Sequence, residues 1–162
     1  MKTTKFITAV LAIFAIAFLS TLESCKKETT GTNEPTATKS GLLTQSSWVM
    51  TSNLVTFPDP VGERDVFALQ DACAKDDLIL FKSDKTVQSD EGALKWDPNA
   101  PQTSMSGTWE LTSNDTKVVM TDGGDVVEFK INTLTSSELI LETTTYDSTL
   151  QADLTIKAIF KH

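Results

Sequence analysis

The chain has 162 residues and a formal net charge of −8, and it contains two cysteines. Over residues 41–162, nineteen acidic residues stand against nine basic ones, with no basic stripe among them. Because phosphate backbones are bound by clustered lysine and arginine, this charge distribution excludes nucleic acid as an expected partner. The length suits one compact domain behind a leader segment.

The first 24 residues have the parts of a secretory signal. Lys2 and Lys5 give a basic start, and an apolar run follows over residues 6–19. That run is too short to span a bilayer comfortably, which takes about 20 apolar residues. It ends in Leu-Glu-Ser-Cys at residues 22–25, and the leucine and the small serine match the cleavage box of a lipoprotein. The sequence therefore predicts a signal peptide over residues 1–24 and a lipid on the thiol of Cys25.

Residues 25–40 are predicted to form the lipidated cysteine and a flexible tether. After Cys25 the stretch is rich in threonine and nearly without apolar side chains, so it cannot bury enough surface to offset its ordering entropy. Its start, CKKETTGTNEP, resembles the start of many lipoproteins of the Bacteroidota. That resemblance implies anchoring in the bacterial outer membrane, on its periplasmic or its cell-surface face. An ordinary signal peptide cut near Ser20 or Ser24, or an uncleaved anchor helix, remains the alternative.

Residues 41–162 alternate apolar and polar side chains with a period of two, which is typical of half-buried strands. The clearest case is the stretch 150–160, where every second residue is apolar, and similar stretches occur at 127–131 and 139–144. Further strands are predicted upstream, at 48–57, 78–82, 86–89, 107–112 and 117–121. Together these runs predict an all-β fold, an up-and-down antiparallel barrel of about eight strands, with a β-sandwich as the alternative.

Turn sequences separate the predicted strands. Residues that tolerate positive φ occur at 122–125, tight turns are predicted at 83–85 and 113–115, and three hydroxyl side chains at 135–137 predict another reversal. The one helix candidate is residues 64–74, which allow a helical turn or two with Leu69 and Ala72 facing inward. A loop packed over one end of the barrel is the alternative for that segment.

Residues with catalytic or metal-binding chemistry are sparse. The single histidine, His162, is the last residue and is expected to be mobile, so it gives a nucleophile no fixed base. Zinc lacks its usual ligands, and the aspartates at 71, 76, 77 and 84 are better explained by a solvated acidic loop than by a calcium site. Cys73 is either a buried, inert thiol or a reactive one that can bridge chains. We therefore expect no enzyme, no metal and no cofactor.

Four phrases of the sequence carry a family resemblance. They are LLTQSSW at 42–48, DACAKDDLILF at 71–81, EGALK at 91–95 and GTWEL at 107–111. Together they resemble the lipocalin-like lipoproteins of the Bacteroidota, most specifically in the second phrase. The resemblance implies a small barrel whose first strand starts with a structural tryptophan. Several members have a second cysteine shortly after the EGA phrase, where this chain has Trp96, so a disulfide with Cys73 is not expected.

The resemblance also implies an interior that holds a small hydrophobic ligand, and four aromatic residues are the candidate lining: Trp48, Phe81, Trp109 and Phe129. An eight-stranded barrel is just wide enough for such a ligand, or is filled by its own side chains, in which case these residues are core. The sequence thus predicts a membrane-anchored, non-enzymatic, lipocalin-like monomer. The alternative is a structural or accessory envelope lipoprotein with a solid core, whose loops bind a protein or a glycan.

Overall fold

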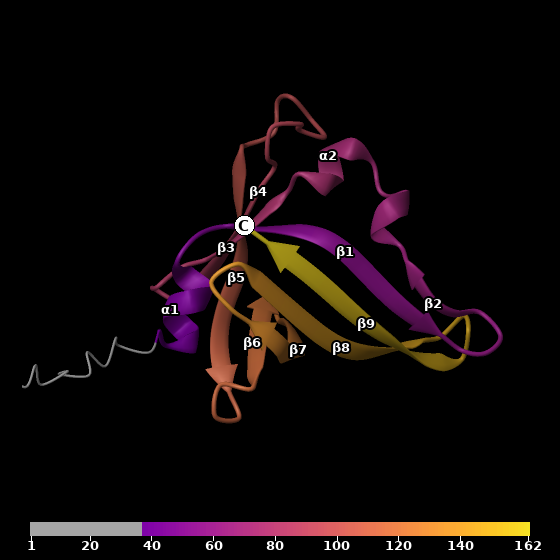
Figure 1. Cartoon of the computed structure of the whole chain (residues 1–162). Coiled ribbons are helices and arrows are strands. Elements are labelled where there is room, and N and C mark those ends of the chain that lie inside the picture. The colour runs from indigo at the N-terminus through magenta and orange to yellow at the C-terminus, as the bar shows by residue number, and fades with distance from the viewer. Residues whose placement is uncertain (1–36) are drawn as a thin grey trace, which may run out of the picture. The chain divides into compact units, whose positions relative to one another are not determined.

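A computed structural model describes residues 37–162, which lie within one compact unit, Thr36–His162. The unit begins with helix α1 (Lys39–Thr44), and two shorter helical segments follow later, η1 (Phe67–Leu69) and α2 (Ala72–Lys75). All other elements are strands (Figure 1). They are β1 (Trp48–Phe57), β2 (Gly62–Asp65), β3 (Leu78–Phe81), β4 (Thr86–Asp90), β5 (Thr103–Thr112), β6 (Lys117–Asp122), β7 (Asp125–Leu134), β8 (Glu138–Asp147) and β9 (Ala152–Lys161).

The sheet closes on itself through β1. From β3 to β9 each strand pairs with the next along the chain, and β1 pairs with both β3 and β9. Strand β2 stands outside this ring and pairs only with the second half of β1. The predicted all-β antiparallel barrel of about eight strands is confirmed. The β-sandwich is excluded, because one closed sheet replaces two stacked ones.

The predicted turns are confirmed at the positions where the backbone needs positive φ. Gly123 and Gly124 join β6 to β7, and residues 113–115 join β5 to β6, all with positive φ. Lys85, at φ 71°, completes the turn before β4. The predicted last strand starts two residues late, since Leu150 lies in the turn, where its amide donates to Asp147 Oδ1 at 2.9 Å.

Residues 64–74 form no continuous helix: the expected turn or two is present as η1 and α2, but the expected inward orientation of Leu69 and Ala72 is wrong. The chain extends along β1 as β2 until Asp65, whose carboxylate accepts the amides of Asn53 and Phe67 at 3.1 and 3.0 Å. These bonds hold the segment against β1, and only the short η1 and α2 follow. Leu69 and Ala72, expected to face inward, are both exposed.

Helix α1 was not predicted, and it takes Lys39 and Ser40 out of the segment assigned to the tether. Thr38 caps the helix, with its Oγ1 accepting the amide of Gly41 at 3.0 Å. The helix delivers Leu43, which is fully buried, into the core. Its six residues are too few to show helical periodicity, so packing of Leu43 rather than sequence pattern reveals it.

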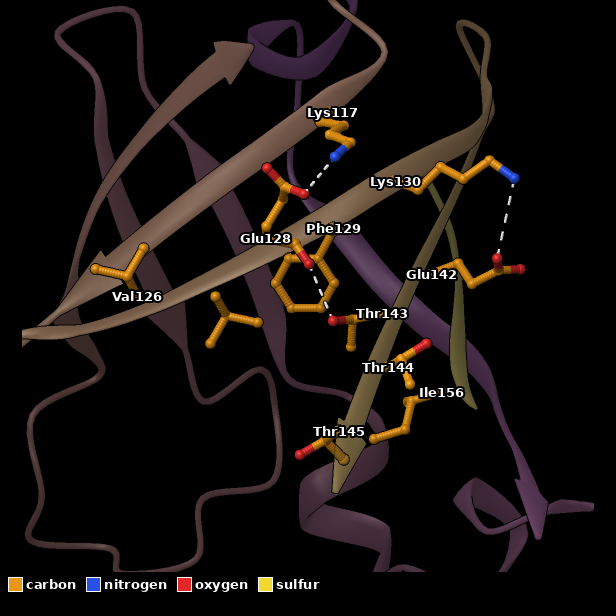
Figure 2. Close-up of a pocket in the computed structure, with 11 residues that line it drawn as sticks. Lys117, Val126, Glu128, Phe129, Lys130, Glu142, Thr143, Thr144, Thr145 and Ile156 are labelled. Atoms are coloured by element: carbon orange, nitrogen blue, oxygen red, sulfur yellow. Dashed lines mark hydrogen bonds and ion pairs between the residues drawn. The ribbon is translucent and has the colours of Figure 1, made fainter. Parts of the chain in front are cut away.

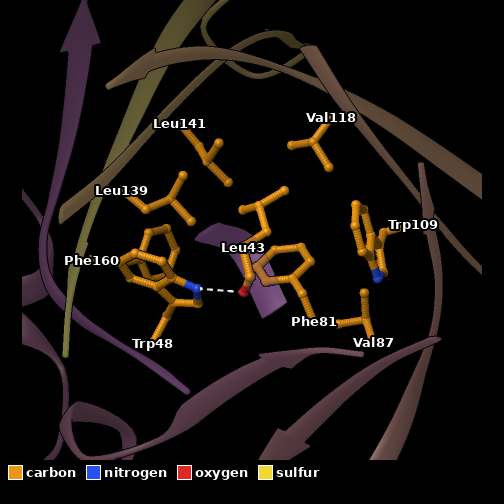
Figure 3. Packing of buried hydrophobic residues seen from close by; sticks show 9 residues of the cluster. All are labelled: Leu43, Trp48, Phe81, Val87, Trp109, Val118, Leu139, Leu141 and Phe160. Carbon is orange, nitrogen blue, oxygen red and sulfur yellow. Dashed lines mark hydrogen bonds between the residues drawn. The ribbon is translucent and has the colours of Figure 1, made fainter. Parts of the chain in front are cut away.

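The core fills the end of the barrel that α1 covers. Leu43 projects from α1 into the middle of the buried side chains, which come from seven of the strands (Figure 3). The indole of Trp48 donates to the carbonyl of Leu43 at 3.0 Å, and Phe81 meets Trp109 edge-on with ring centroids 5.7 Å apart. The cluster comprises Leu43, Trp48, Phe81, Val87, Trp109, Val118, Leu139, Leu141 and Phe160. Close packing and satisfied indole N–H groups make this end solid.

Candidate functional site

The four aromatic residues predicted to line a ligand site divide into two groups. Trp48, Phe81 and Trp109 lie buried in the core cluster, where the N–H of Trp109 donates to the carbonyl of Lys82 at 3.0 Å. Phe129 packs against that cluster from β7 and also faces a cavity. The structure therefore gives the first three a packing role, and contact between any of the four and a ligand stays a prediction.

The barrel wall forks between β7 and β8. The two strands pair from Leu134, opposite Leu139, to Lys130, opposite Glu142. The pairing ends at Lys130 and Glu142, although each strand continues for five residues beyond that point. Residues 125–129 remain paired with β6, and residues 143–147 remain paired with β9. The two strands thus separate at one end, each held by its outer neighbour.

A side chain replaces the backbone ladder at the point of the fork. Thr143 Oγ1 donates to the carbonyl of Glu128 at 2.9 Å, where the amide of a β8 residue would otherwise be the donor. Because a side-chain hydroxyl reaches farther than a backbone amide, this bond tolerates strands that have begun to diverge. The fork is therefore a formed feature with its own hydrogen bond at the vertex.

A cavity of about 860 Å³ occupies the fork (Figure 2). Side chains from β6 to β9 line it, and Phe129 stands on one wall with Thr143, Thr144 and Thr145 on the other. Its lining is Lys117, Val126, Val127, Glu128, Phe129, Lys130, Glu142, Thr143, Thr144, Thr145 and Ile156. Inward-facing residues such as Phe129 and outward-facing ones such as Glu128 both contribute, because the cavity passes through the barrel wall.

The charged residues of this β7/β8 cleft are paired with one another. Lys117 Nζ lies 2.5 Å from Glu128 Oε1, and Lys130 Nζ lies 4.0 Å from Glu142 Oε1. All four side chains are partly exposed, so these pairs contribute little stability. The pairs matter for the kind of ligand that the cleft can bind, because they leave no unpaired charge among its lining residues. The rest of the lining consists of apolar side chains and threonine hydroxyl groups.

One family model matches the chain, that of the Lipocalin-like domain, over residues 46–141. This chain belongs to the lipocalin-like domain family. A comparison with curated proteins gives no match. The matched residues end before Thr143, so the β8 wall of the cleft and all of β9 lie beyond them.

The lipocalin-like domain holds its histidine in place, and the expectation of a mobile His162 is wrong. The imidazole lies 3.8 Å from the ring of Trp48, and Nδ1 lies 2.6 Å from Ser46 Oγ and 2.7 Å from the carbonyl of Ser47. Gln45 Nε2, which can only donate, lies 2.9 Å from His162 Nε2. With Gln45 as the donor to Nε2, Nδ1 carries the ring proton and donates to the carbonyl of Ser47, while Nε2 lies 3.4 Å from Ser46 Oγ.

Of the four aspartates at 71, 76, 77 and 84, Asp84 and Asp76 have separate structural partners. Asp84 accepts the amide and the hydroxyl of Thr86, and these bonds hold the pKa of Asp84 below its usual value. Asp76 Oδ2 accepts the amides of Ala93 and Leu94 at 2.7 and 2.8 Å. Desolvation, with Glu91, Asp76 and Asp90 nearby, raises the pKa of Asp77. Within residues 37–162 no three acidic, histidine or cysteine side chains are grouped to hold a metal ion.

Both cysteines can be placed with respect to the described part of this lipocalin-like chain. Cys73 is a free, half-buried thiol on α2. Cys25 lies outside the described residues, as do the predicted signal peptide and most of the predicted tether. Among residues 37–162, no helix has the length and apolarity needed to cross a bilayer.

One pattern in the sequence marks the position of the cleft. Leu139 and Leu141 face the core, and the next two positions on that face of β8 are Thr143 and Thr145. A change from leucine to threonine on an inward face marks the place where a strand stops covering a packed core. Val127 and Ile156, the other inward residues of the cleft, read from sequence as ordinary strand positions.

Proposed function

We propose that this chain is a non-enzymatic lipoprotein, anchored in a bacterial outer membrane by Cys25, that holds a small apolar ligand in the β7/β8 cleft. The cleft carries this proposal, because its volume of about 860 Å³ lies in the range of small-molecule sites, about 300–1,000 Å³. Membership of the lipocalin-like family supports a binding role. His162, the one histidine of the chain, is engaged by Gln45 Nε2 and the carbonyl of Ser47, which supports a function without a histidine base.

The chemistry of the cleft favours a mainly apolar ligand with a hydroxyl or ether group. Phe129, Val127 and Ile156 offer apolar contact from the two walls, and the threonines of β8 offer hydroxyl groups. The cations of the cleft already face carboxylates, so a strongly anionic ligand would have to displace Glu128 or Glu142. We therefore place a neutral, elongated molecule in the cleft.

The second candidate is a structural or accessory envelope protein, and the solid end of the barrel favours it. Nine buried side chains fill the interior beside α1 and leave that half to packing alone. The two candidates differ in whether the cleft is filled in the purified protein. Native mass spectrometry of the chain from Lys26 onward, purified without its leader, distinguishes them.

We expect native mass spectra of that protein to show a small adduct that is lost on denaturation. Val127→Trp should abolish the adduct, because Val127 lines the cleft and an indole there would occupy its volume. Val61→Trp is the matched control, since Val61 has a similar exposed fraction, 46% against 41%, and lies in the β1–β2 turn away from the cleft. An adduct that persists in Val127→Trp, or its absence from the unaltered protein extracted from membranes, would contradict ligand binding in the cleft.

The anchor has a separate test that does not depend on the ligand. We expect Cys25→Ser to move the protein from the membrane fraction to the soluble fraction, or to leave an unprocessed precursor, because serine cannot form the thioether to diacylglycerol. Metabolic labelling with radioactive palmitate, followed by fractionation, measures both effects. Cys73→Ser is the matched control and should keep the label. Label or membrane partition that survives Cys25→Ser would show that the protein is not anchored at this residue.

A further inference from the structure

The walls of the β7/β8 cleft are strand edges with free backbone groups. The amide of Ile131 donates to the carbonyl of Thr116 on the β6 side at 2.9 Å. Backbone groups alternate in direction along an antiparallel strand, so those of Val126 and Glu128 point toward β8. The carbonyl of Glu128 accepts from Thr143 of β8, which agrees with this assignment.

The same alternation gives the free groups of the opposite wall. Lys130 and Glu142 stand opposite each other at the last paired position before the fork. The backbone groups of Glu142 therefore point toward β7, and so do those of Thr144 and Tyr146. Beyond the vertex no β7–β8 pair continues the ladder, so both edges present amides and carbonyls to the cleft.

These edges contain neither lysine nor proline, and their charged residues are Asp125, Glu128 and Asp147. Exposed edges are normally blunted by lysine, proline, a bulge or a covering element. Here the five free residues of β7 are DVVEF and those of β8 are TTTYD, which are mostly β-branched or aromatic. Val126 is 65% exposed and Tyr146 is 62% exposed. Large apolar side chains and high strand propensity favour addition of a further strand.

We propose that the β7/β8 cleft accepts an extended segment of another protein, which adds a strand to the barrel wall. Only a second backbone can pair with the amides and carbonyls of both edges, which a small apolar ligand leaves to water. Beyond the bond between Thr143 and Glu128 at the vertex, residues 125–127 and 145–147 leave about 10 Å of strand on each edge, at about 3.3 Å per residue. This function goes beyond ligand binding, and the added strand would also cover the mouth of the ligand cavity.

A second copy of this chain is a poor source for that strand. Apart from the edges at the fork, the edge strand of the sheet within residues 37–162 is β2, whose sequence is Gly-Glu-Arg-Asp. Docking β2 of another copy would place three charged side chains in a cleft whose own charges are already paired. A segment from a different protein, uncharged and with alternating apolar residues, fits better.

The geometry also fixes the direction and side-chain pattern of the partner segment. Because β7 and β8 are antiparallel, a strand between them is antiparallel to one and parallel to the other. Alternate side chains would point inward, toward Phe129 and Ile156, and the others outward, beside the pairs formed by Lys117 and Lys130. An alternating valine and threonine peptide meets these requirements.

The test uses fluorescence anisotropy of a labelled seven-residue peptide of alternating valine and threonine, titrated with the chain from Lys26 onward. We expect saturable binding, and at least a tenfold loss when alternate amides of the peptide are N-methylated, since this removes backbone donors and keeps the side chains. Val126→Pro should weaken binding about tenfold, because its amide faces the cleft and proline is tolerated at a strand edge. Val126→Thr, which keeps the amide, should bind normally.

Circular dichroism melting curves of both Val126 variants establish that they fold, and the N-methylated peptide tests the proposal without altering the protein. Equal affinity for the methylated and unmethylated peptides would overturn strand addition and leave an apolar groove. No binding at about 1 mM protein would also overturn strand addition, because a dissociation constant of about 1 mM corresponds to a binding free energy of only about −4 kcal/mol. If the mass spectra show no adduct but the peptide still binds, ligand binding in the cleft is contradicted and strand addition is supported.

Discussion

Trp48→Ala is expected to lower the free energy of unfolding by about 3–5 kcal/mol, the range for truncation of a buried aromatic side chain. Trp48 is fully buried in the core cluster, and its indole donates to the carbonyl of Leu43. The substitution leaves a cavity and an unpaired carbonyl where α1 meets the barrel, and it removes the surface on which His162 stacks. Urea denaturation followed by far-ultraviolet circular dichroism measures the loss.

Trp96→Ala is the matched control for Trp48→Ala. Trp96 is 73% exposed in the loop between β4 and β5, and its backbone amide, which alanine keeps, donates to Glu91 Oε2 at 3.2 Å. The expected change is within about 0.5 kcal/mol. Similar losses for the two substitutions would show that α1 and Trp48 do not close the barrel as described.

Gly107→Ala is expected to destabilise the protein by about 3 kcal/mol or more. Gly107 has φ +108°, where strain alone costs about 1–3 kcal/mol for other residues. A Cβ atom there would lie 1.8 Å from the carbonyl oxygen of Thr121 on β6, so the backbone of β5 or β6 must move. The position adjoins the irregularity between Val87 and Gln88, where β4 and β5 change register. Urea midpoints of the variant and the unaltered protein provide the comparison.

Gly62→Ala separates backbone strain from steric clash at Gly107. Gly62 has φ +68°, and an added Cβ would meet no atom within 4 Å. Only the left-handed conformation is then penalised, by about 1–2 kcal/mol. If Gly107→Ala lowers the free energy of unfolding by no more than Gly62→Ala does, the backbone of β5 does not approach the carbonyl of Thr121 closely.

Much of the fold was predictable because alternation and turn residues act locally. The strand from Lys117 was predicted within one residue of its end, and the glycine pair after it turns the chain as expected. Strand β5 extends farther than predicted, to Thr103, because its first residues pair with β4 across the irregularity near Gly107. A register change of this kind depends on the partner strand and leaves no pattern in the strand itself.

The helices were the least predictable elements. The segment 64–74 has helix-compatible residues, but the carboxylate of Asp65 ties it to β1, and that tie depends on a residue twelve positions away. Helix α1 is short and starts in a threonine-rich stretch that reads as tether. In both places a tertiary contact overrides local preference.

The sequence by itself determined the class of fold, and from it come the predictions of a leader, of a lipid on Cys25 and of no metal or nucleophilic site. These depend on composition, spacing and local alternation, which need no knowledge of distant contacts. Only the tertiary structure decided that Trp48, Phe81 and Trp109 pack one end of the barrel and that β7 and β8 separate at the other. Strand register is set by pairing between segments, so a place where pairing stops is visible only when both strands are in position.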